Sequence, residues 1–356
     1  MSVSDRPVEP EHSRILQSPA LFAGLTSTAA QQAWGITEGA AGMVSQVRGL
    51  AQAVGLPHEI KNLTLRMPWK KLWPGFIPVS HRIFAQPEQI RCTPAPRLVI
   101  SCGRQAVMAS LWLKARLGDK VFTVHIQDPK IRTTRFDMVV APEHDGLTGP
   151  NVFCSRGALH HVHRGVLQAA AASPAAAQLK SLNAPFVTVL LGGPNNCYRF
   201  TPTELAPLVE SLKQAVSRQN VRLAVLPSRR TPPDVVQLFQ QAFGAPHFVW
   251  DRSTENPYMA ALALCSHLVV TGDSVSMVSE GAATEKPLYV FHLPEKRRSR
   301  RFRRFHDRFA ADGISRPFIG QFDDWTYSSP NPTQQIADLI RSRLGEPDVF
   351  SARSAA

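Results

Sequence analysis

The sequence lacks the short motifs that identify the commonest nucleotide-binding and hydrolytic enzymes. It has no G-x-x-x-x-G-K-[ST] phosphate loop, no complete G-x-G-x-x-G dinucleotide fingerprint and no G-x-S-x-G nucleophile turn. These absences argue against P-loop chemistry, nicotinamide-dependent redox chemistry and serine-hydrolase chemistry.

Long apolar runs and paired cysteines are also missing. The most apolar stretch, residues 260–270, is shorter than the roughly 20 residues that a membrane-spanning helix requires, and Ser266 and His267 interrupt it. The five cysteines are far apart and form no C-x-x-C pair, which argues against a disulfide framework and a cysteine-based zinc site; they are Cys92, Cys102, Cys154, Cys197 and Cys265.

The first thirty residues have no apolar block of the kind found in secretory signals, and they carry Asp5, Glu9 and Glu11. We therefore expect residues 1–30 to be a flexible tail and the protein to be cytoplasmic. Peripheral attachment to the inner membrane remains open at this point.

Charge is distributed unevenly along the chain. The sequence has 40 Lys and Arg against 27 Asp and Glu, and seven of the basic residues lie between Lys296 and Arg304. Such a run attracts phosphate on an anionic lipid or a phosphorylated glycan acceptor, although a solvated helix or loop end is the alternative. Nucleic acid is the weaker partner, because no recognisable reader module accompanies the basic residues.

Apolar runs alternate with helical patterns in both halves of the chain. Residues 32–36, 97–102, 121–126 and 136–140 read as strands in the first half, and 185–191, 221–226, 247–250, 268–271 and 288–292 in the second. The capping-box spacing at Thr201–Glu204 predicts a helix over 201–216. This alternation predicts an α/β protein of two Rossmann-like domains, over 31–183 and 184–331, followed by a C-terminal helix and tail over 332–356.

The best candidate site is the turn at 271–280. Residues Gly272, Asp273 and Ser274 follow a strand and open a helix, where backbone N–H groups can bind an anion. The hydroxyl of Ser276 adds a donor, and Glu280 lies two turns along the helix, where it could accept from a ribose diol. An ordinary strand–helix junction with a good cap is the alternative.

Two further turns offer anion-binding groups. Gly192, Gly193 and Asn195 follow the buried strand 185–191, and two glycines permit close approach of a phosphate or of the facing domain. Arg229 or Arg230, in the turn after 221–226, could neutralise a diphosphate.

Candidate bases lie in the first half. His125 and Asp128 follow one strand, and His144 and Asp145 follow the next, so each pair could activate an acceptor hydroxyl. A histidine satisfied within its own loop is the commoner case. The triplet His160, His161 and His163 lacks surrounding carboxylate or cysteine ligands, so we expect no metal site and no resident cofactor.

Six ordered motifs resemble the mitochondrial fission (elongated-mitochondria) protein family, which has plant and bacterial members, and the chain resembles a bacterial one. These motifs are Trp34–Gly39 with Gly42 and Gln46, His125–Pro129, Pro142–Asp145, Gly149–Val152, Leu191–Asn195 and Thr271–Glu280.

The family is in turn similar to GT-B glycosyltransferases, in which two Rossmann domains face each other across a cleft. That resemblance implies a nucleotide-sugar on the second domain, with its diphosphate at Ser274 and Ser276 and its ribose at Glu280. It therefore predicts a glycosyltransferase acting on a cell-envelope glycan or lipid. The alternative is a non-catalytic scaffold of the fission family that binds a protein or membrane partner.

Overall fold

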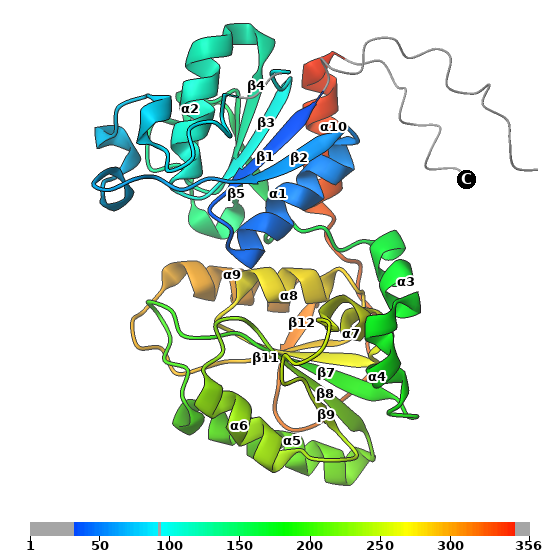
Figure 1. Ribbon diagram of the computed structural model, residues 1–356. Helices are drawn as coiled ribbons and strands as arrows, with labels where there is room; N and C mark the ends of the chain where they lie inside the picture. The colour runs from blue at the N-terminus through cyan, green and yellow to red at the C-terminus, as the bar shows by residue number, and fades with distance from the viewer. Residues whose placement is uncertain (1–31, 92–93, 346–356) are drawn as a thin grey trace, which may run out of the picture.

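The computed structural model describes residues 32–91 and 94–345, so the predicted tail over 1–30 lies outside it. It contains two parallel sheets, each of six strands (Figure 1). The strands of the first are β1 (Ala33–Thr37), β2 (His58–Asn62), β3 (Leu98–Cys102), β4 (Phe122–Ile126), β5 (Met138–Pro142) and β6 (Val152–Ser155).

The strand order of the first sheet is β2-β1-β3-β4-β5-β6. The order reverses between β1 and β3, and an open α/β sheet binds ligands outside the carboxyl ends of its strands at such a point. Glu38 follows β1 there, but it accepts hydrogen bonds from the backbone N–H and side-chain amide of Gln105 at 2.6 and 2.8 Å.

The second sheet has the strand order of a Rossmann domain. Its order β12-β11-β10-β7-β8-β9 places the switch point between β7 and β10. The strands are β7 (Phe186–Leu191), β8 (Arg222–Pro227), β9 (Phe248–Val249), β10 (His267–Thr271), β11 (Leu288–Phe291) and β12 (Ser315–Pro317). The turns that follow β7 and β10 are therefore neighbours, although about eighty residues separate them in sequence.

Helices cover both faces of each sheet, and the inner strands β1, β3, β5 and β7 are accordingly buried along their whole length. In the first domain α1 (Ala41–Val54) and α2 (Ala106–Leu117) lie on opposite faces, over separate apolar clusters. In the second domain α5 (Pro202–Gln219) and α6 (Pro233–Ala242) cover one face, and α7 (Tyr258–Leu264), α8 (Val275–Ala282) and α9 (Arg300–Ala311) cover the other.

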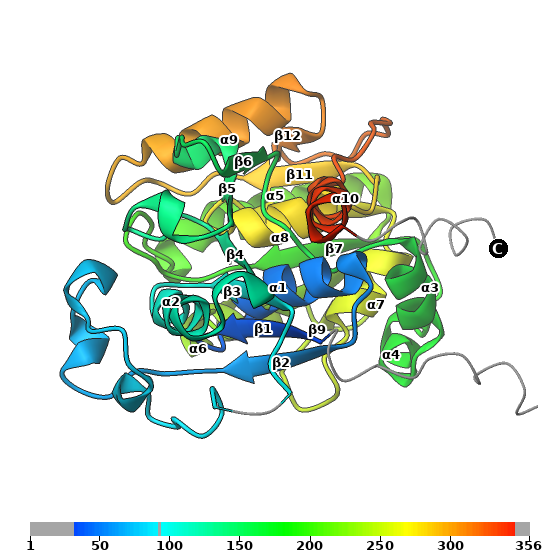
Figure 2. The ribbon, with the colours of Figure 1, turned by 90° about the horizontal axis from the view of Figure 1, so that it is seen from above.

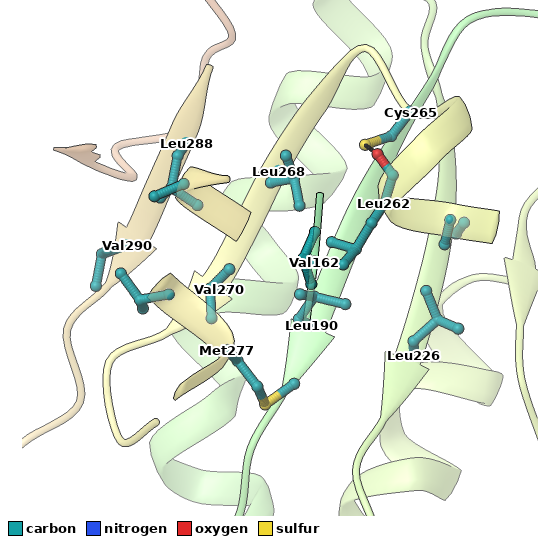
Figure 3. Packing of buried hydrophobic residues seen from close by; sticks show 14 of the residues in the cluster. Val162, Leu190, Leu226, Leu262, Cys265, Leu268, Val270, Met277, Leu288 and Val290 are labelled. Atoms are coloured by element: carbon teal, nitrogen blue, oxygen red, sulfur yellow. Dashed lines mark hydrogen bonds between the residues drawn. The ribbon is translucent and has the colours of Figure 1, made fainter. Parts of the chain in front are cut away.

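The apolar cluster beneath α7 and α8 fixes the second sheet to these helices (Figure 3). Leu268 and Val270 of β10 meet Leu190 of β7 and Met277 of α8 there. The start of α8 is thus held by a packed interior, which matters for the site described below.

The chain crosses between the domains twice. After β6 it passes to α3 (Arg164–Ala172) and α4 (Ala177–Lys180), and both helices pack against α7 of the second domain. The final helix α10 (Pro332–Leu344) returns to the first domain and packs on α1 (Figures 1 and 2). The predicted boundary at 183/184 therefore falls after two helices that already contact the second domain.

The predicted fold class is confirmed: the protein is α/β, with two Rossmann-like domains in a GT-B-like arrangement. The capping box Thr201–Glu204 begins α5 as the sequence indicates. Three strands escaped prediction, β2, β6 and β12, which lie at the edges of their sheets and lack the continuous buried run of the inner strands. None of the helices in the described ranges is long and apolar enough to span a membrane.

Candidate functional site

A cavity of about 690 Å³ lies between the two domains. The first domain contributes the start of α1 and His161, and the second domain contributes the loops after β8 and β9 together with the start of α8. The lining side chains used below are Ser45, His161, Arg229, Arg230, Trp250, Tyr258, Ser274, Ser276, Met277 and Glu280.

The first turn of α8 faces this cavity. Ser274 caps the helix, its hydroxyl accepting from the Met277 N–H at 3.4 Å, and both Ser274 and Ser276 line the cavity. The first turn holds no acidic residue, so its positive dipole end is not neutralised within the helix. Gly272 lies deeper, with its N–H bonded to the Phe291 carbonyl and its own carbonyl to His306, and it does not line the cavity.

Asp273 joins the two turns at the switch point instead of binding an anion. Its carboxylate is buried and accepts from the Gly193 N–H at 2.9 Å and from the Thr271 hydroxyl at 2.7 Å. Burial raises the pKa of Asp273, and the Gly193 N–H opposes that rise. A Cβ on Gly192 would lie 2.2 Å from the Asp273 carboxylate, so only glycine fits there.

The prediction that the Gly192–Asn195 turn offers open N–H groups to a phosphate is therefore corrected. The Gly192 N–H donates to the Thr271 hydroxyl at 2.9 Å, and the Gly193 N–H is held by Asp273. Asn195 accepts from the N–H groups of Cys197 and Tyr198 at 2.7 and 3.0 Å. Close backbone approach is the reason for the glycines, but the partner is the neighbouring turn.

The two arginines after β8 have different surroundings. Arg230 donates to the Asp273 carboxylate at 3.2 Å and to the Gly193 carbonyl at 3.2 Å, so its charge is largely used within the domain. Arg229 is exposed, and within the described residues it makes a long hydrogen bond of 3.4 Å to the Gly39 carbonyl of the first domain. Arg229 is the cation of this pair that can meet an anion.

Glu280 is buried and links the two domains. Its carboxylate accepts from the Ser45 hydroxyl of α1 at 2.6 Å and from the Tyr258 hydroxyl of α7 at 2.6 Å. Burial raises the pKa of Glu280, and the hydrogen bonds from Ser45 and Tyr258 partly offset it. An ionised carboxylate has about four acceptor sites, so a ligand hydroxyl can still bind, but Glu280 is not the free acceptor that the sequence indicates.

His161 lines the cavity, whereas the sequence analysis weighed it only as a metal ligand. Its Nδ1 lies 2.9 Å from the Ser45 Oγ. The Ser45 hydroxyl donates its single hydrogen to the Glu280 carboxylate, so it can only accept from His161. His161 must then carry its proton on Nδ1, which leaves Nε2 as the unprotonated nitrogen. Burial lowers the pKa of His161 below its usual value, so the ring is neutral at pH 7.

The structure corrects the placement of His125 and Asp128. His125 is buried, bonds to the Ser101 hydroxyl at 2.8 Å and packs against Phe136, and burial lowers its pKa to about 3. Asp128 is partly buried, which opposes ionisation, but hydrogen bonds from Lys130 lower its pKa overall. Neither residue lines the cavity.

His144 and Asp145 face a different part of the domain interface. His144 packs edge-on against Phe305 of α9, and burial lowers its pKa to about 3. The Oδ1 of Asp145 lies 2.6 Å from the Nε of Arg301, which belongs to the predicted basic run. This pair therefore contacts α9 and does not line the cavity, which corrects the expectation that it could activate an acceptor hydroxyl there.

The basic run forms a loop over 296–299 and the first turns of α9. The helix buries Phe305, His306 and Phe309 against the second domain and leaves its arginines exposed. Across residues 32–91 and 94–345, no three His, Cys, Asp or Glu side chains come together as metal ligands.

Comparison with protein families gives a match over most of the chain. The family model described as mitochondrial fission ELM1 matches residues 41–344. The mitochondrial fission protein ELM1 of Arabidopsis thaliana is 31% identical over 282 residues, which cover 70% of this chain and 64% of that protein. The chain thus spans less than two thirds of its plant relative. An uncharacterized protein of Rickettsia prowazekii is 25% identical over 351 residues, covering 87% of this chain and 98% of the relative.

Among solved structures, the fold is similar to UDP-GlcNAc 2-epimerases. The enzyme from Methanocaldococcus jannaschii superimposes with a TM-score of 0.54 at 10% identity, over 88% of this chain and 100% of that one. A putative enzyme from Listeria monocytogenes gives 0.53 at 12% identity, over 89% and 97%. The enzyme from Neisseria meningitidis bound to UDP-GlcNAc gives 0.51 at 9% identity, over 89% and 100%. At these identities the likeness shows the fold alone.

Proposed function

This chain belongs to the mitochondrial fission ELM1 family, and from the geometry of its cleft we propose that it binds a nucleoside diphosphate sugar and transfers the sugar to a cell-envelope glycan or lipid. The observation that carries the proposal is the cavity itself. An uncompensated helix start and Arg229 face a neutral histidine of the other domain across it. Two structural neighbours were solved with UDP-GlcNAc, which supports a nucleotide-sugar as the ligand class.

The second domain holds the donor in this proposal. The N–H groups at the start of α8, the hydroxyls of Ser274 and Ser276, and the Arg229 guanidinium bind the diphosphate. The apolar part of the cavity, at Trp250 and Met277, takes the base. These groups also stabilise the charge that develops on the leaving diphosphate, which is how such transfer proceeds without a metal ion.

His161 acts as the general base. Its Nε2 takes the proton of the acceptor hydroxyl as that oxygen bonds to the anomeric carbon, and the bond from this carbon to the diphosphate oxygen breaks with its electron pair on the diphosphate. Glu280 and Ser45 hold the imidazole in the tautomer that leaves Nε2 free. The basic run 296–304 holds the phosphate of an anionic lipid or phosphorylated glycan acceptor.

Calorimetric titration with UDP, GDP, ADP, CDP and TDP tests the donor site. We expect one of them to bind, and Ser274→Ala with Ser276→Ala to weaken that binding at least tenfold, because each hydrogen bond to a charged group contributes about 1.5–3 kcal/mol net of the water it replaces. Ser217→Ala, which removes an exposed hydroxyl bonded to the Gln214 carbonyl within α5 and away from the cavity, is a matched serine control. A folded sample that binds none of the five contradicts the proposal.

The second candidate function is a scaffold that keeps the cleft without turnover, and the positions of His125 and His144 away from the cavity favour it. Turnover of the nucleotide-sugar that binds best separates the two. In a transferase, His161→Ala should keep donor affinity and lower the transfer rate about 10²–10⁴-fold. Binding without any turnover, with or without His161, supports the scaffold.

A further inference from the structure

Exposed apolar side chains gather on one segment of the first domain. Across the described residues, six large hydrophobic side chains are exposed, and five of them lie between residues 67 and 79: Met67, Leu72, Trp73, Phe76 and Val79, the sixth being Ile319. Phe76 is 79% exposed and Trp73 is 55% exposed. The segment projects from the first domain as the blue loops at the left of both ribbon views (Figures 1 and 2).

The charge around these side chains is predominantly positive. Residues 62–87 contain no Asp or Glu, and Arg66, Lys70, Lys71 and Arg82 are all exposed. The neighbouring loop after β4, whose Ile131 lies near Gly75, adds exposed Arg132 and Arg135. We call residues 66–82 with this neighbouring loop the aromatic-basic surface.

Short helices and buried neighbours hold the segment that carries these side chains. Three short 3₁₀ helices, over Trp69–Lys71, Pro74–Phe76 and His81–Ile83, shape it, and Ile77 and Ile83 are buried in the first domain's core. Arg104 donates to the carbonyls of Lys70 and Leu72 at 2.6 and 2.9 Å and lies over the Trp73 ring. The exposed residues therefore alternate with anchored ones.

We propose that the aromatic-basic surface docks the protein on an anionic lipid bilayer. Tryptophan and phenylalanine enter the interfacial region of a membrane, and lysine and arginine beside them meet anionic headgroups. A protein interface would gain from charges of both signs, whereas residues 66–82 carry cations alone and Asp128 of the neighbouring loop is paired with Lys130. The inference is independent of what the cleft binds.

Sedimentation with vesicles tests it, using phosphatidylcholine alone and phosphatidylcholine with about one third phosphatidylglycerol. We expect binding to the anionic vesicles, weakened at least tenfold by Trp73→Ser with Phe76→Ser, since the two rings carry most of the apolar area. Lys70→Ser with Lys71→Ser should cost about fivefold for each cation removed. Brominated lipid should quench the tryptophan emission of the wild-type chain more than that of Trp73→Phe.

Two controls separate this surface from others. Ile319→Ser removes an equally exposed apolar side chain from the second domain and should leave binding unchanged. Arg297→Ser with Arg298→Ser tests the basic run, which lies on another element. The proposal is overturned if Trp73→Ser with Phe76→Ser binds vesicles like the wild type. It is also overturned if these substitutions abolish self-association in light scattering while the wild-type chain ignores vesicles.

Discussion

Glu280, Ser45 and His161 form a chain of hydrogen bonds across the domain interface, and they show how one buried carboxylate can serve two purposes. The carboxylate holds two hydroxyl groups from different domains, and through Ser45 it fixes the tautomer of His161. The price of this arrangement is a carboxylate removed from water. The free energy of unfolding should therefore depend on whether Glu280 is ionised.

Glu280→Gln tests this pH dependence of stability. Burial raises the pKa of Glu280, so the folded chain holds the carboxyl proton more tightly than the unfolded chain does. A glutamate in an unfolded chain has a pKa of about 4.3. The stabilisation from this group is present below that value and is lost as the pH rises through the folded pKa. Glutamine cannot ionise, so the free energy of unfolding of Glu280→Gln relative to wild type should increase from pH 4 to pH 7.

Urea unfolding at several pH values measures this difference. Glu210→Gln, an exposed position on α5, is the matched control and should show no comparable trend. A flat difference between Glu280→Gln and wild type across the range would mean that the carboxylate is compensated in the folded chain at every pH.

Among the elements, the turn between β8 and α6 carries two neighbouring arginines that have different hydrogen-bond partners. Both arginines line the cavity, but Arg230 is bonded to the buried carboxylate of Asp273, whereas Arg229 reaches the Gly39 carbonyl of the first domain. The Asp273 carboxylate also fastens the turn after β7 to the turn after β10. The strand order of the second sheet brings these three turns together, so their functions are coupled.

The two arginines should respond oppositely to alanine. Arg230→Ala should lower the free energy of unfolding by about 1–3 kcal/mol, because it leaves the buried Asp273 carboxylate short of a partner. Arg229→Ala should leave stability within about 0.5 kcal/mol and weaken nucleoside diphosphate binding about tenfold. Denaturant unfolding and calorimetry on both variants measure this, and equal losses of affinity in the two would reject the assignment.

Over the whole molecule, the returning helix α10 ties the second domain to the first. Ile336, Ala337 and Ile340 are buried against α1, and the Arg341 guanidinium donates to the Ala53 carbonyl at 2.6 Å. Together with the crossing after β6, this gives two covalent connections between the domains. The cleft is thereby held between two bodies that cannot separate freely.

Ile340→Ala should loosen the first domain more than the second. The lost burial and the cavity left behind cost about 2–5 kcal/mol, and amide exchange should accelerate in α1 before α5. Leu339→Ala, which removes a partly buried side chain of the same helix, should have a smaller effect. Uniform acceleration in both domains would indicate that they unfold as one unit.

Local sequence determined the two Rossmann-like domains and most of their elements. Continuous apolar runs and good caps act over a few residues, so β7, α5 and α8 could be predicted within a residue or three of their bounds. The edge strands β2 and β12 could not, because most of their residues are exposed or half-buried and they carry no continuous apolar run. The glycines of the β7 turn were recognised as a close approach, but the sequence did not reveal what approaches them.

Tertiary structure decided which residues line the cavity. His125 and His161 are both histidines near apolar segments, and only packing buries one beneath Phe136 and turns the other toward the cavity. Ser45 meets Glu280 across 235 residues of sequence, a distance over which no local pattern carries information. Residue types and periodicity therefore determined the framework and its anion-binding helix start, whereas burial and long-range contact determined which polar groups remain free to act.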